Sequence, residues 1–145
     1  MDYKKPSLTV DMFIVNKNRC EGLSIENEFI LIKRKNNPCK DHWALPGGFV
    51  DYGETTESAA IREAKEETSI DIELIDLFGV YSKPDRDPRG HTVTIVYLAK
   101  GDFSQMDAND DAKDIGIFSF KDLNSLDLAF DHEDILKDIF DYINL

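Results

Sequence analysis

The chain has 145 residues, a length that fits one domain with a substantial core, because 41% of its residues are hydrophobic and 10% are aromatic. Its net charge of -12 at pH 7 disfavours binding to duplex nucleic acid or to a membrane surface, since their phosphate groups would repel the protein. The same charge is compatible with an anionic substrate held through a metal ion. We therefore expect a single domain over residues 1–145.

The start of the chain carries no apolar signal core, and no apolar run approaches membrane-spanning length. We expect a soluble, cytoplasmic protein. Cys20 and Cys39 lie in polar sequence without metal-binding spacing, and reduced thiols are the default in that compartment. A disulfide between them would require the fold to bring their Cα atoms within about 7 Å of each other.

Two strands are predicted in the first third of the chain, over 7–15 and 28–33, because these segments are rich in β-branched and apolar residues. The polar segment 16–27 between them is typical of a loop or hairpin. Segment 33–41 is basic and turn-rich, so we expect an exposed loop there. Trp43 follows, and core packing is a more natural role for it than stacking on a base.

A glycine-rich loop over 45–54 leads into the most informative helix of the chain. Gly47, Gly48 and Gly53 permit positive φ angles and let the backbone approach a ligand or metal closely. Thr55 is the natural N-cap of the helix that follows, because its hydroxyl can accept a hydrogen bond from a backbone amide of the first turn. The loop can therefore contribute carbonyls and amides to a site beside the helix.

Three carboxylates lie at positions i, i+3 and i+4 of this helix: Glu63, Glu66 and Glu67. Each helical residue advances about 100° around the axis, so the three side chains form one acidic face. Ala60 and Ala64 fall on the neighbouring arc, where their small side chains can pack the helix onto a core. A glutamate-rich helix can also be a simple solvated surface, but that interpretation leaves the glycine loop unexplained.

The pattern as a whole resembles the Nudix box, the signature of hydrolases that cleave a nucleoside diphosphate linked to another moiety. Gly48 is followed after five residues by Glu54, and after seven more by the helical run 62–70. Two positions depart from the usual pattern, because Ala64 is smaller than the usual aliphatic residue and Ser69 replaces a glycine. A helix commonly ends on a left-handed residue, so Ser69 should cost about 1 kcal/mol there without moving a carboxylate.

The resemblance implies a metal-dependent pyrophosphohydrolase with Mg²⁺ as the cation and Mn²⁺ as an alternative. Mg²⁺ prefers oxygen ligands, which suits a carboxylate group without histidine, and it would activate a water for attack on phosphorus. Arg62 and Glu54 are expected to orient the ligands through an ion pair. The metal ligands implied by the resemblance are the Gly48 carbonyl, Glu63, Glu66 and Glu67.

Segment 83–90 is expected to be irregular, because two prolines, a glycine and several charges break both helical and strand patterns. It resembles the corresponding stretch of Nudix ADP-ribose pyrophosphatases, in which a proline beyond the box helps to mark the subgroup. Either Pro84 or Pro88 fills that role. Arg86 and Arg89 would then bind phosphate or ribose oxygens through their planar guanidinium groups, and an internally salt-bridged turn is the alternative.

Two strands, over 70–82 and 91–99, are expected to flank this loop. The acidic segment 101–114 follows them. In the family a carboxylate from a loop in this region often completes the metal site or acts as general base, so the resemblance suggests Asp111 or Asp114. Glu66 and Glu67 of the helix are the alternatives for the base.

A last strand over 115–120 and an amphipathic helix over 131–143 complete the prediction, with Asp131 or its neighbour as the helix cap. Phe130 and His132 resemble a C-terminal element of the same subgroup and are candidates for the base pocket, although core packing is the preferred role for Phe130. The implied fold is the Nudix α/β/α sandwich, a mixed sheet with the box helix on one face and the C-terminal helix on the other.

Three functions are compatible with this pattern. The first is hydrolysis of ADP-ribose, or a related nucleoside diphosphate sugar, to AMP and ribose 5-phosphate. The second is a MutT-like pyrophosphohydrolase acting on oxidised nucleoside triphosphates. The third is a non-catalytic ligand-sensing module, ranked last because the carboxylates are complete. The expected partner is a small-molecule nucleotide, without nucleic acid or membrane, and a homodimer is compatible with the family.

Overall fold

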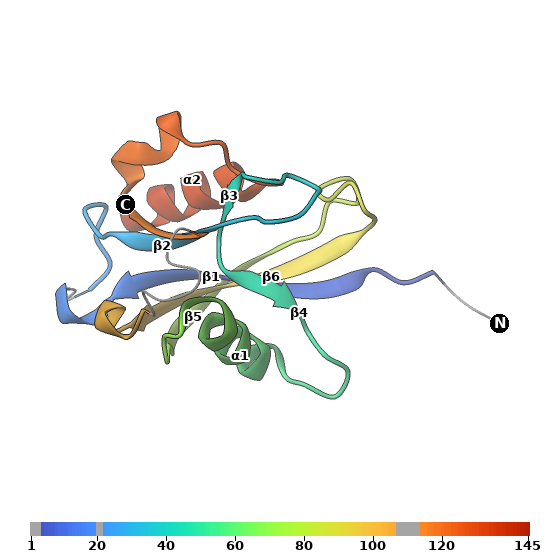
Figure 1. Cartoon of the computed structure of the whole chain (residues 1–145), viewed down its shortest axis with the longest axis horizontal. Coiled ribbons are helices and arrows are strands. Elements are labelled where there is room, and N and C mark those ends of the chain that lie inside the picture. The colour runs from blue at the N-terminus through green and yellow to red at the C-terminus, as the bar shows by residue number, and fades with distance from the viewer. Residues whose placement is uncertain (1–3, 20–21, 107–113) are drawn as a thin grey trace.

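The structure is a computed structural model that describes residues 4–19, 22–106 and 114–145 (Figure 1). Its strands are β1 Ser7–Asn16, β2 Phe29–Lys33, β3 Trp43–Ala44, β4 Gly47–Phe49, β5 Glu73–Tyr81, β6 Thr92–Gly101 and β7 Ile115–Phe118. Its α-helices are α1 Thr56–Thr68 and α2 His132–Ile143. Short 3-10 helices span Lys17–Arg19, Phe103–Gln105 and Phe120–Ser125.

The strands form one mixed sheet with the order β3-β2-β1-β6-β5, with β4 paired to β1 and β7 paired to β2. β1 and β6 are parallel along their whole length, and the remaining pairs are antiparallel. β1 is central because its side chains are apolar on both faces. Met12 and Ile14 enter one core cluster while Phe13 and Val15 enter the other, as the alternation of a strand requires.

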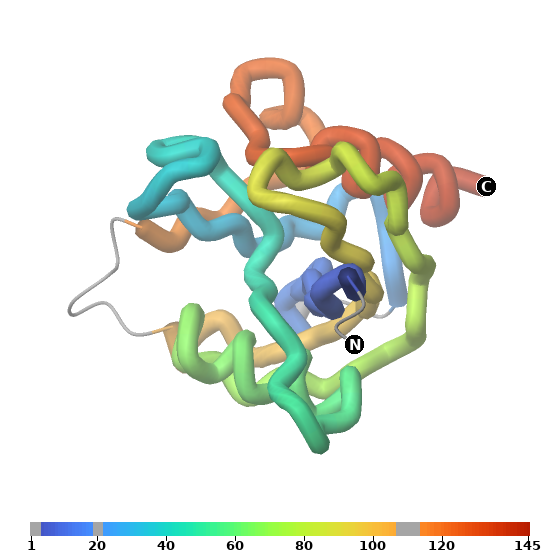
Figure 2. The backbone as a smooth tube through the Cα atoms, turned by 90° about the vertical axis from the view of Figure 1, so that its right-hand side faces the viewer, coloured from blue at the N-terminus to red at the C-terminus, as the bar shows by residue number. Residues whose placement is uncertain are grey.

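The two helices cover opposite faces of this sheet (Figures 1 and 2). α1 packs against one face through its small residues, of which Ala60 and Ala64 are fully buried. α2 packs on the other face through Ile135, Leu136 and Ile139. The predicted α/β/α arrangement is confirmed, and small side chains let α1 lie close to the strands that carry the site.

The predicted boundaries of the box helix are confirmed at both ends. The Thr55 hydroxyl accepts a hydrogen bond from the Ser58 amide, which satisfies an otherwise unpaired helical N–H. At the other end Ser69 is left-handed, with φ 66°, and its amide donates to the Lys65 carbonyl. The helix therefore ends in the left-handed cap conformation that glycine usually adopts, although the residue here is a serine.

The glycine segment before α1 differs from the expected loop, because Gly47–Phe49 is strand β4 and pairs with β1. A side chain on Gly47 would place its Cβ 2.5 Å from Asp11 Oδ1. A side chain on Gly48 would place its Cβ 2.5 Å from Glu63 Oε1. These glycines therefore serve close packing between a strand, a helix and a buried acid.

The remaining differences are small. The last predicted strand ends at Phe118, and the segment after it forms a 3-10 helix. Trp43 packs edge-on against Phe118, with ring centroids 4.8 Å apart, in agreement with core packing. Cys39 is a free thiol, and Cys20 lies outside the described residues. Over the part of the chain described, no helix has the length and apolar character needed to cross a bilayer.

Candidate active site

A pocket of ≈ 230 Å³ lies where β1, β4 and α1 meet the loop before β6 and the start of α2. Glu67 lines this pocket together with Asp11, Arg89 and His132. A second pocket of ≈ 310 Å³ adjoins it and is lined by basic residues of the β2–β3 loop and by acids of α1. Glu67 lines both pockets, so the box helix stands at their junction.

Arg62 organises the acids of α1. Its Nε and Nη2 donate to the two oxygens of Glu54 at 2.8 and 2.9 Å, and its Nη1 donates to Glu63 at 2.9 Å. Nη2 also donates to the Phe49 carbonyl at 3.0 Å, which ties the helix to β4. Hydrogen bonds from Arg62 and from the Asp51 amide lower the pKa of Glu54 to about 2. We call Glu54, Arg62, Glu63, Glu66 and Glu67 the carboxylate cluster.

Glu67 is the buried acid of this cluster. Its Oε1 accepts a hydrogen bond from the Gly47 amide at 2.8 Å. Burial raises the pKa of Glu67 to about 8, and the neighbouring charges of Glu63 and Asp11 act in the same direction. Burial also raises the pKa of Glu63, although Arg62 partly offsets it. Arg62 thus pairs with Glu54 and Glu63, whereas burial favours the neutral form of Glu67.

The guanidinium of Arg86 is buried and binds other groups of the protein. Its Nε and Nη2 bind the two oxygens of Asp131 at 2.9 and 2.7 Å, and its Nη1 donates to the Thr92 hydroxyl at 2.8 Å. Its side chain is only 5% exposed. This geometry favours the internally salt-bridged interpretation for Arg86, because its three donor nitrogens already have partners. Pro84 and Pro88 are exposed and do not line the ≈ 230 Å³ pocket.

Arg89 faces the pocket instead. Its guanidinium binds Asp87 at 2.8 Å and lies 5.7 Å from the Phe49 ring and 5.6 Å from the Phe130 ring. Arg34 lies 4.8 Å from the same Phe130 ring. Both arginines and both rings line the pocket, and the Arg89 side chain remains 45% exposed. The lining of the pocket that holds Glu67 therefore also includes aromatic and cationic groups in contact with one another.

The comparisons with known proteins decide the family. The NUDIX domain matches residues 6–139 of this chain. The chain belongs to the Nudix family. It is 48% identical to the ADP-ribose pyrophosphatase of Methanocaldococcus jannaschii over 143 residues, which cover 98% of this chain and 78% of that relative. A Nudix hydrolase with this fold cleaves pyrophosphate bonds, so the enzymatic prediction is confirmed at this level.

A second relative of this Nudix hydrolase is the ADPR responsive transcriptional repressor NtrR of Acinetobacter baylyi, 34% identical over 99% of this chain. The chain spans 56% of that repressor's length. The crystal structure of a mutT/nudix family protein from Listeria innocua superposes with a TM-score of 0.79 at 40% identity, covering 97% of this chain and 96% of that one. Because one relative is a transcriptional repressor, the absence of a nucleic-acid partner stays a prediction.

Nudix hydrolases generally use divalent cations, and the donors of this cluster suit such an ion. They are all oxygens, and among the described residues Glu67 is a buried acid beside two others, with the Gly47 amide rather than a cation as its hydrogen-bond donor. Among the described residues, no three acidic, histidine or cysteine side chains converge on one point in this conformation. Arg62 binds Glu63 and Glu66, and Gly47 binds Glu67.

The acidic candidates beyond the helix divide into two cases. Asp111 lies outside the described residues. Asp114 lines the ≈ 310 Å³ pocket together with Glu66 and Glu67, and its Oδ2 lies 3.1 Å from Lys35 Nζ. The structure therefore brings Asp114 to the same pocket as two of the box glutamates.

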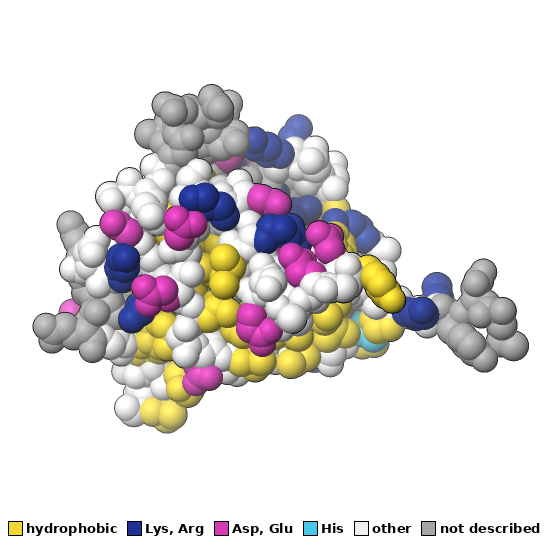
Figure 3. All heavy atoms as spheres, turned by 90° about the horizontal axis from the view of Figure 1, so that it is seen from below, with side chains coloured by type: hydrophobic (Ala, Val, Ile, Leu, Met, Phe, Trp, Pro, Cys, Tyr) yellow, Lys and Arg dark blue, Asp and Glu magenta, His cyan; other side chains and the backbone are white. Residues whose placement is uncertain are grey.

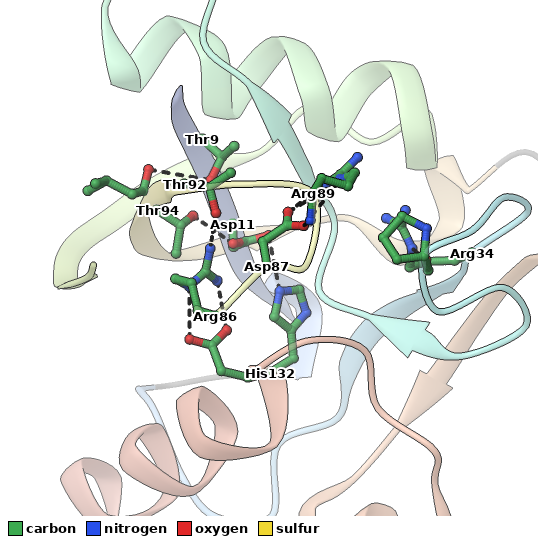
Figure 4. A network of polar contacts seen from close by, with 12 residues as sticks. Thr9, Asp11, Arg34, Arg86, Asp87, Arg89, Thr92, Thr94 and His132 are labelled. Atoms are coloured by element: carbon green, nitrogen blue, oxygen red, sulfur yellow. Dashed lines mark hydrogen bonds and ion pairs between the residues drawn. The ribbon is translucent and has the colours of Figure 1, made fainter. Parts of the chain in front are cut away.

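A buried polar network contributes to the wall of this pocket, and the sequence did not indicate that its members come together (Figure 4). Thr94 donates to Asp11 Oδ2 at 2.6 Å, and His132 Nδ1 accepts from the Leu45 amide at 3.0 Å. His132 Nε2 lies 3.7 Å from Asp11 Oδ1. Burial raises the pKa of Asp11 and lowers the pKa of His132. We call Asp11, Arg86, Thr94, Asp131 and His132 the buried network.

The missed residues carried different signals. Asp11 is the one acid of strand β1 and directly precedes the apolar run 12–15, where a charged side chain needs a partner. Arg34 belongs to the basic segment 33–41, which was expected to be an exposed loop, and its position against Phe130 depends on the fold. The predicted base-pocket candidates His132 and Phe130 both line the ≈ 230 Å³ pocket.

Proposed function

We propose that this Nudix hydrolase cleaves ADP-ribose to AMP and ribose 5-phosphate with Mg²⁺ as its cation. The observation that carries the proposal is the pocket that Glu67, Arg89 and Phe130 line together. Glu67 would hold the metal ion that binds the pyrophosphate. Arg89 suits a phosphate oxygen, and the Phe130 ring suits a base or a sugar. The 48% identity to an ADP-ribose pyrophosphatase supports the same substrate.

The expected metal ligands are Glu63, Glu66 and Glu67, with the Gly48 carbonyl. When bound, the cation neutralises pyrophosphate oxygens and lowers the pKa of a water for attack on phosphorus. Arg62 holds the cluster to β4 through Glu54 and the Phe49 carbonyl. The proposed role of Arg62 is therefore to keep the acids aligned.

The two arginines of the loop before β6 receive different roles. Arg89 is the proposed contact to a phosphate of the substrate, because its side chain is half exposed and lines the pocket. Arg86 is the proposed support of that loop, because its partners are Asp131 and Thr92. A direct substrate contact by Arg86 would require its buried ion pair to open.

The MutT-like alternative uses the same carboxylates with an oxidised purine triphosphate. The surface seen from the α1 side mixes acidic, basic and hydrophobic side chains and carries no broad basic patch over the described residues drawn there (Figure 3). A compact nucleotide, neutralised by a metal, suits such a surface better than a polyanion. We expect the pocket wall formed by Arg34, Arg89 and Phe130 to determine whether ADP-ribose or an oxidised purine triphosphate is preferred.

The test compares kcat/KM for ADP-ribose and for 8-oxo-dGTP in the presence of Mg²⁺. We expect ADP-ribose to be preferred, and Arg89→Ala to lower its kcat/KM by about tenfold or more, as loss of one charge-assisted contact predicts. Lys83→Ala is the matched control, because it removes a cation from the same loop outside the ≈ 230 Å³ pocket. A preference for 8-oxo-dGTP would overturn the substrate, and tight ADP-ribose binding without hydrolysis would favour a sensor.

A further inference from the structure

We propose that Asp11 and His132 form a recognition site for a sugar hydroxyl in the wall of the ≈ 230 Å³ pocket. The inference rests on the proposed function, in that the hydroxyl belongs to a ribose of the nucleoside diphosphate substrate. Both residues line the pocket, and both are almost fully buried. They come from β1 and from the first residue of α2, so the site joins two distant parts of the chain (Figure 4).

The hydrogen bonds of His132 fix its tautomer. The Leu45 amide donates to Nδ1 at 3.0 Å, so Nδ1 carries no proton. A neutral imidazole then carries its proton on Nε2, and burial favours the neutral form by lowering the pKa of His132. Within the described residues Nε2 donates no hydrogen bond, because Asp11 Oδ1 at 3.7 Å is too distant. His132 therefore presents a free donor to the pocket.

Asp11 presents the matching acceptor. Its Oδ2 accepts from the Thr94 hydroxyl at 2.6 Å, whereas its Oδ1 accepts no hydrogen bond from the described part of the chain. A carboxylate oxygen in a pocket wall without a donor has an unused acceptor position, so a ligand or water can donate to it. Asp11 Oδ1 and His132 Nε2 thus form an adjacent acceptor and donor.

A hydroxyl group matches this pair because it accepts and donates at the same atom. Its oxygen accepts from His132 Nε2–H and its proton is donated to Asp11 Oδ1. An ionised phosphate oxygen can only accept, so it could pair with His132 Nε2–H but could not donate to Asp11 Oδ1. An apolar group would leave both partners unpaired. Among the parts of a nucleoside diphosphate sugar, the ribose hydroxyls fit this requirement, while Arg89, and Glu67 through a metal ion, suit the diphosphate.

The surrounding structure holds the pair rigidly. Arg86 binds Asp131, the residue before His132, through two hydrogen bonds. Gly47 keeps the space beside Asp11 open, since a Cβ there would lie 2.5 Å from Oδ1. Donor and acceptor are therefore preorganised on a strand and a helix terminus, as precise recognition requires.

The experiment compares ADP-ribose with analogues that each lack one hydroxyl of either ribose. Removing the recognised hydroxyl leaves the donor and acceptor unpaired, so one deoxy analogue should have a kcat/KM about tenfold or more below that of ADP-ribose. Analogues altered in the adenosine ribose and in the distal ribose form separate arms, which distinguish the two sources of the hydroxyl. Calorimetry in EDTA also measures the Kd of ADP-ribose and of each deoxy analogue, and gives the ratio of these two constants without turnover.

Two variants test the pair directly. Asp11→Asn can still accept from Thr94 but replaces the free acceptor with an amide donor. His132→Asn can still accept from the Leu45 amide near the Nδ1 position but has no donor at Nε2. In both variants the ratio between ADP-ribose and the sensitive deoxy analogue should fall to within about twofold of one. Tyr81→Phe is the matched control, because it removes a hydrogen bond to Asp138 outside this pocket and should keep the wild-type ratio.

A purely structural role for the pair lowers the kcat/KM of all analogues equally and leaves their ratio unchanged, which would overturn the proposal. Equal use of every deoxy analogue by the wild type would overturn it as well, because a bound water would then satisfy the pair. If the wild type hydrolyses none of these compounds, the proposed function fails. The Kd ratio in EDTA then still decides the hydroxyl site, with a ratio near one contradicting it.

Discussion

The carboxylate cluster and the buried network each place an arginine among acids, but they differ in how the chain builds them. The cluster comes from residues 54–67, within and just before one helix, and Arg62 keeps contact with solvent. The buried network draws on β1, the loop before β6, β6 and the start of α2, and the Arg86 side chain is 5% exposed. Local sequence can specify the first arrangement, whereas only the folded sheet assembles the second.

Arg62 and Arg86 should therefore differ in how much they contribute to the free energy of unfolding. Arg62 is bonded to Glu54, Glu63 and a backbone carbonyl near the surface, where solvent screens its charge. Arg86 is desolvated, so removal of its partner leaves a buried charge unpaired. The cluster is expected to govern turnover, and the network to govern stability and the shape of the pocket.

The largest expected effect is on catalysis by Glu67→Gln. This change removes a charged metal ligand with little change in volume, so kcat for ADP-ribose should fall on the order of 100-fold or more, since outer-shell partners of metal ligands alone cost roughly 10- to 100-fold. The melting temperature should not decrease, because Glu67 is a buried acid. Steady-state kinetics at saturating Mg²⁺ and a thermal melt check both points, and unimpaired turnover would refute the assignment.

The next effect is on stability and distinguishes the two arginines. Arg86→Ala should lower the free energy of unfolding by about 3 kcal/mol, the lower end for a buried pair, because it leaves the half-buried Asp131 without its partner. Arg62→Ala should cost clearly less stability and more turnover. Urea unfolding of the two variants measures the contrast. Similar losses of stability in both would mean that the burial difference does not decide their roles.

The difference between a site built by one helix and a site built by distant strands also explains which features could be predicted from the sequence. The i, i+3, i+4 spacing placed the glutamates of α1 on one face, and the missing glycine predicted the left-handed Ser69, because both depend on helix geometry alone. Asp11 escaped notice because its partners Thr94 and His132 are 83 and 121 residues away in the chain, as their numbers show. Gly47–Phe49 was assigned to a loop because its pairing with β1 is equally non-local.

A smaller effect is expected at the end of α1. Ser69 has φ 66°, a conformation that glycine adopts without steric cost, so Ser69→Gly should raise the free energy of unfolding by about 1 kcal/mol. The residue lies beyond the carboxylates, and kcat should stay unchanged. Chemical denaturation of the variant provides the measurement, and a loss of stability would show that the serine makes a compensating interaction.

The smallest effect concerns acid pH. Burial alone would raise the pKa of Asp87, but hydrogen bonds from the Arg89 side chain and amide outweigh it and hold that pKa below its ordinary value. This stabilisation is present above the unfolded pKa of Asp87 and is lost as pH falls through the folded value. Between about pH 5 and about pH 2, wild type should lose stability more steeply than Arg89→Ala, by less than about 1 kcal/mol because solvent screens the pair. Parallel curves from pH-dependent unfolding would contradict this.

Metal binding tests most directly whether the carboxylate cluster holds the metal and the buried network does not. Mn²⁺ binding, followed by calorimetry, is compared in wild type, Glu67→Gln and Asp131→Asn at a temperature where all three are folded. The account predicts that Glu67→Gln weakens Mn²⁺ binding by about tenfold or more, while Asp131→Asn keeps the wild-type affinity. Unchanged binding in Glu67→Gln, or an equal loss in Asp131→Asn, would contradict the assignment of the metal to the carboxylate cluster.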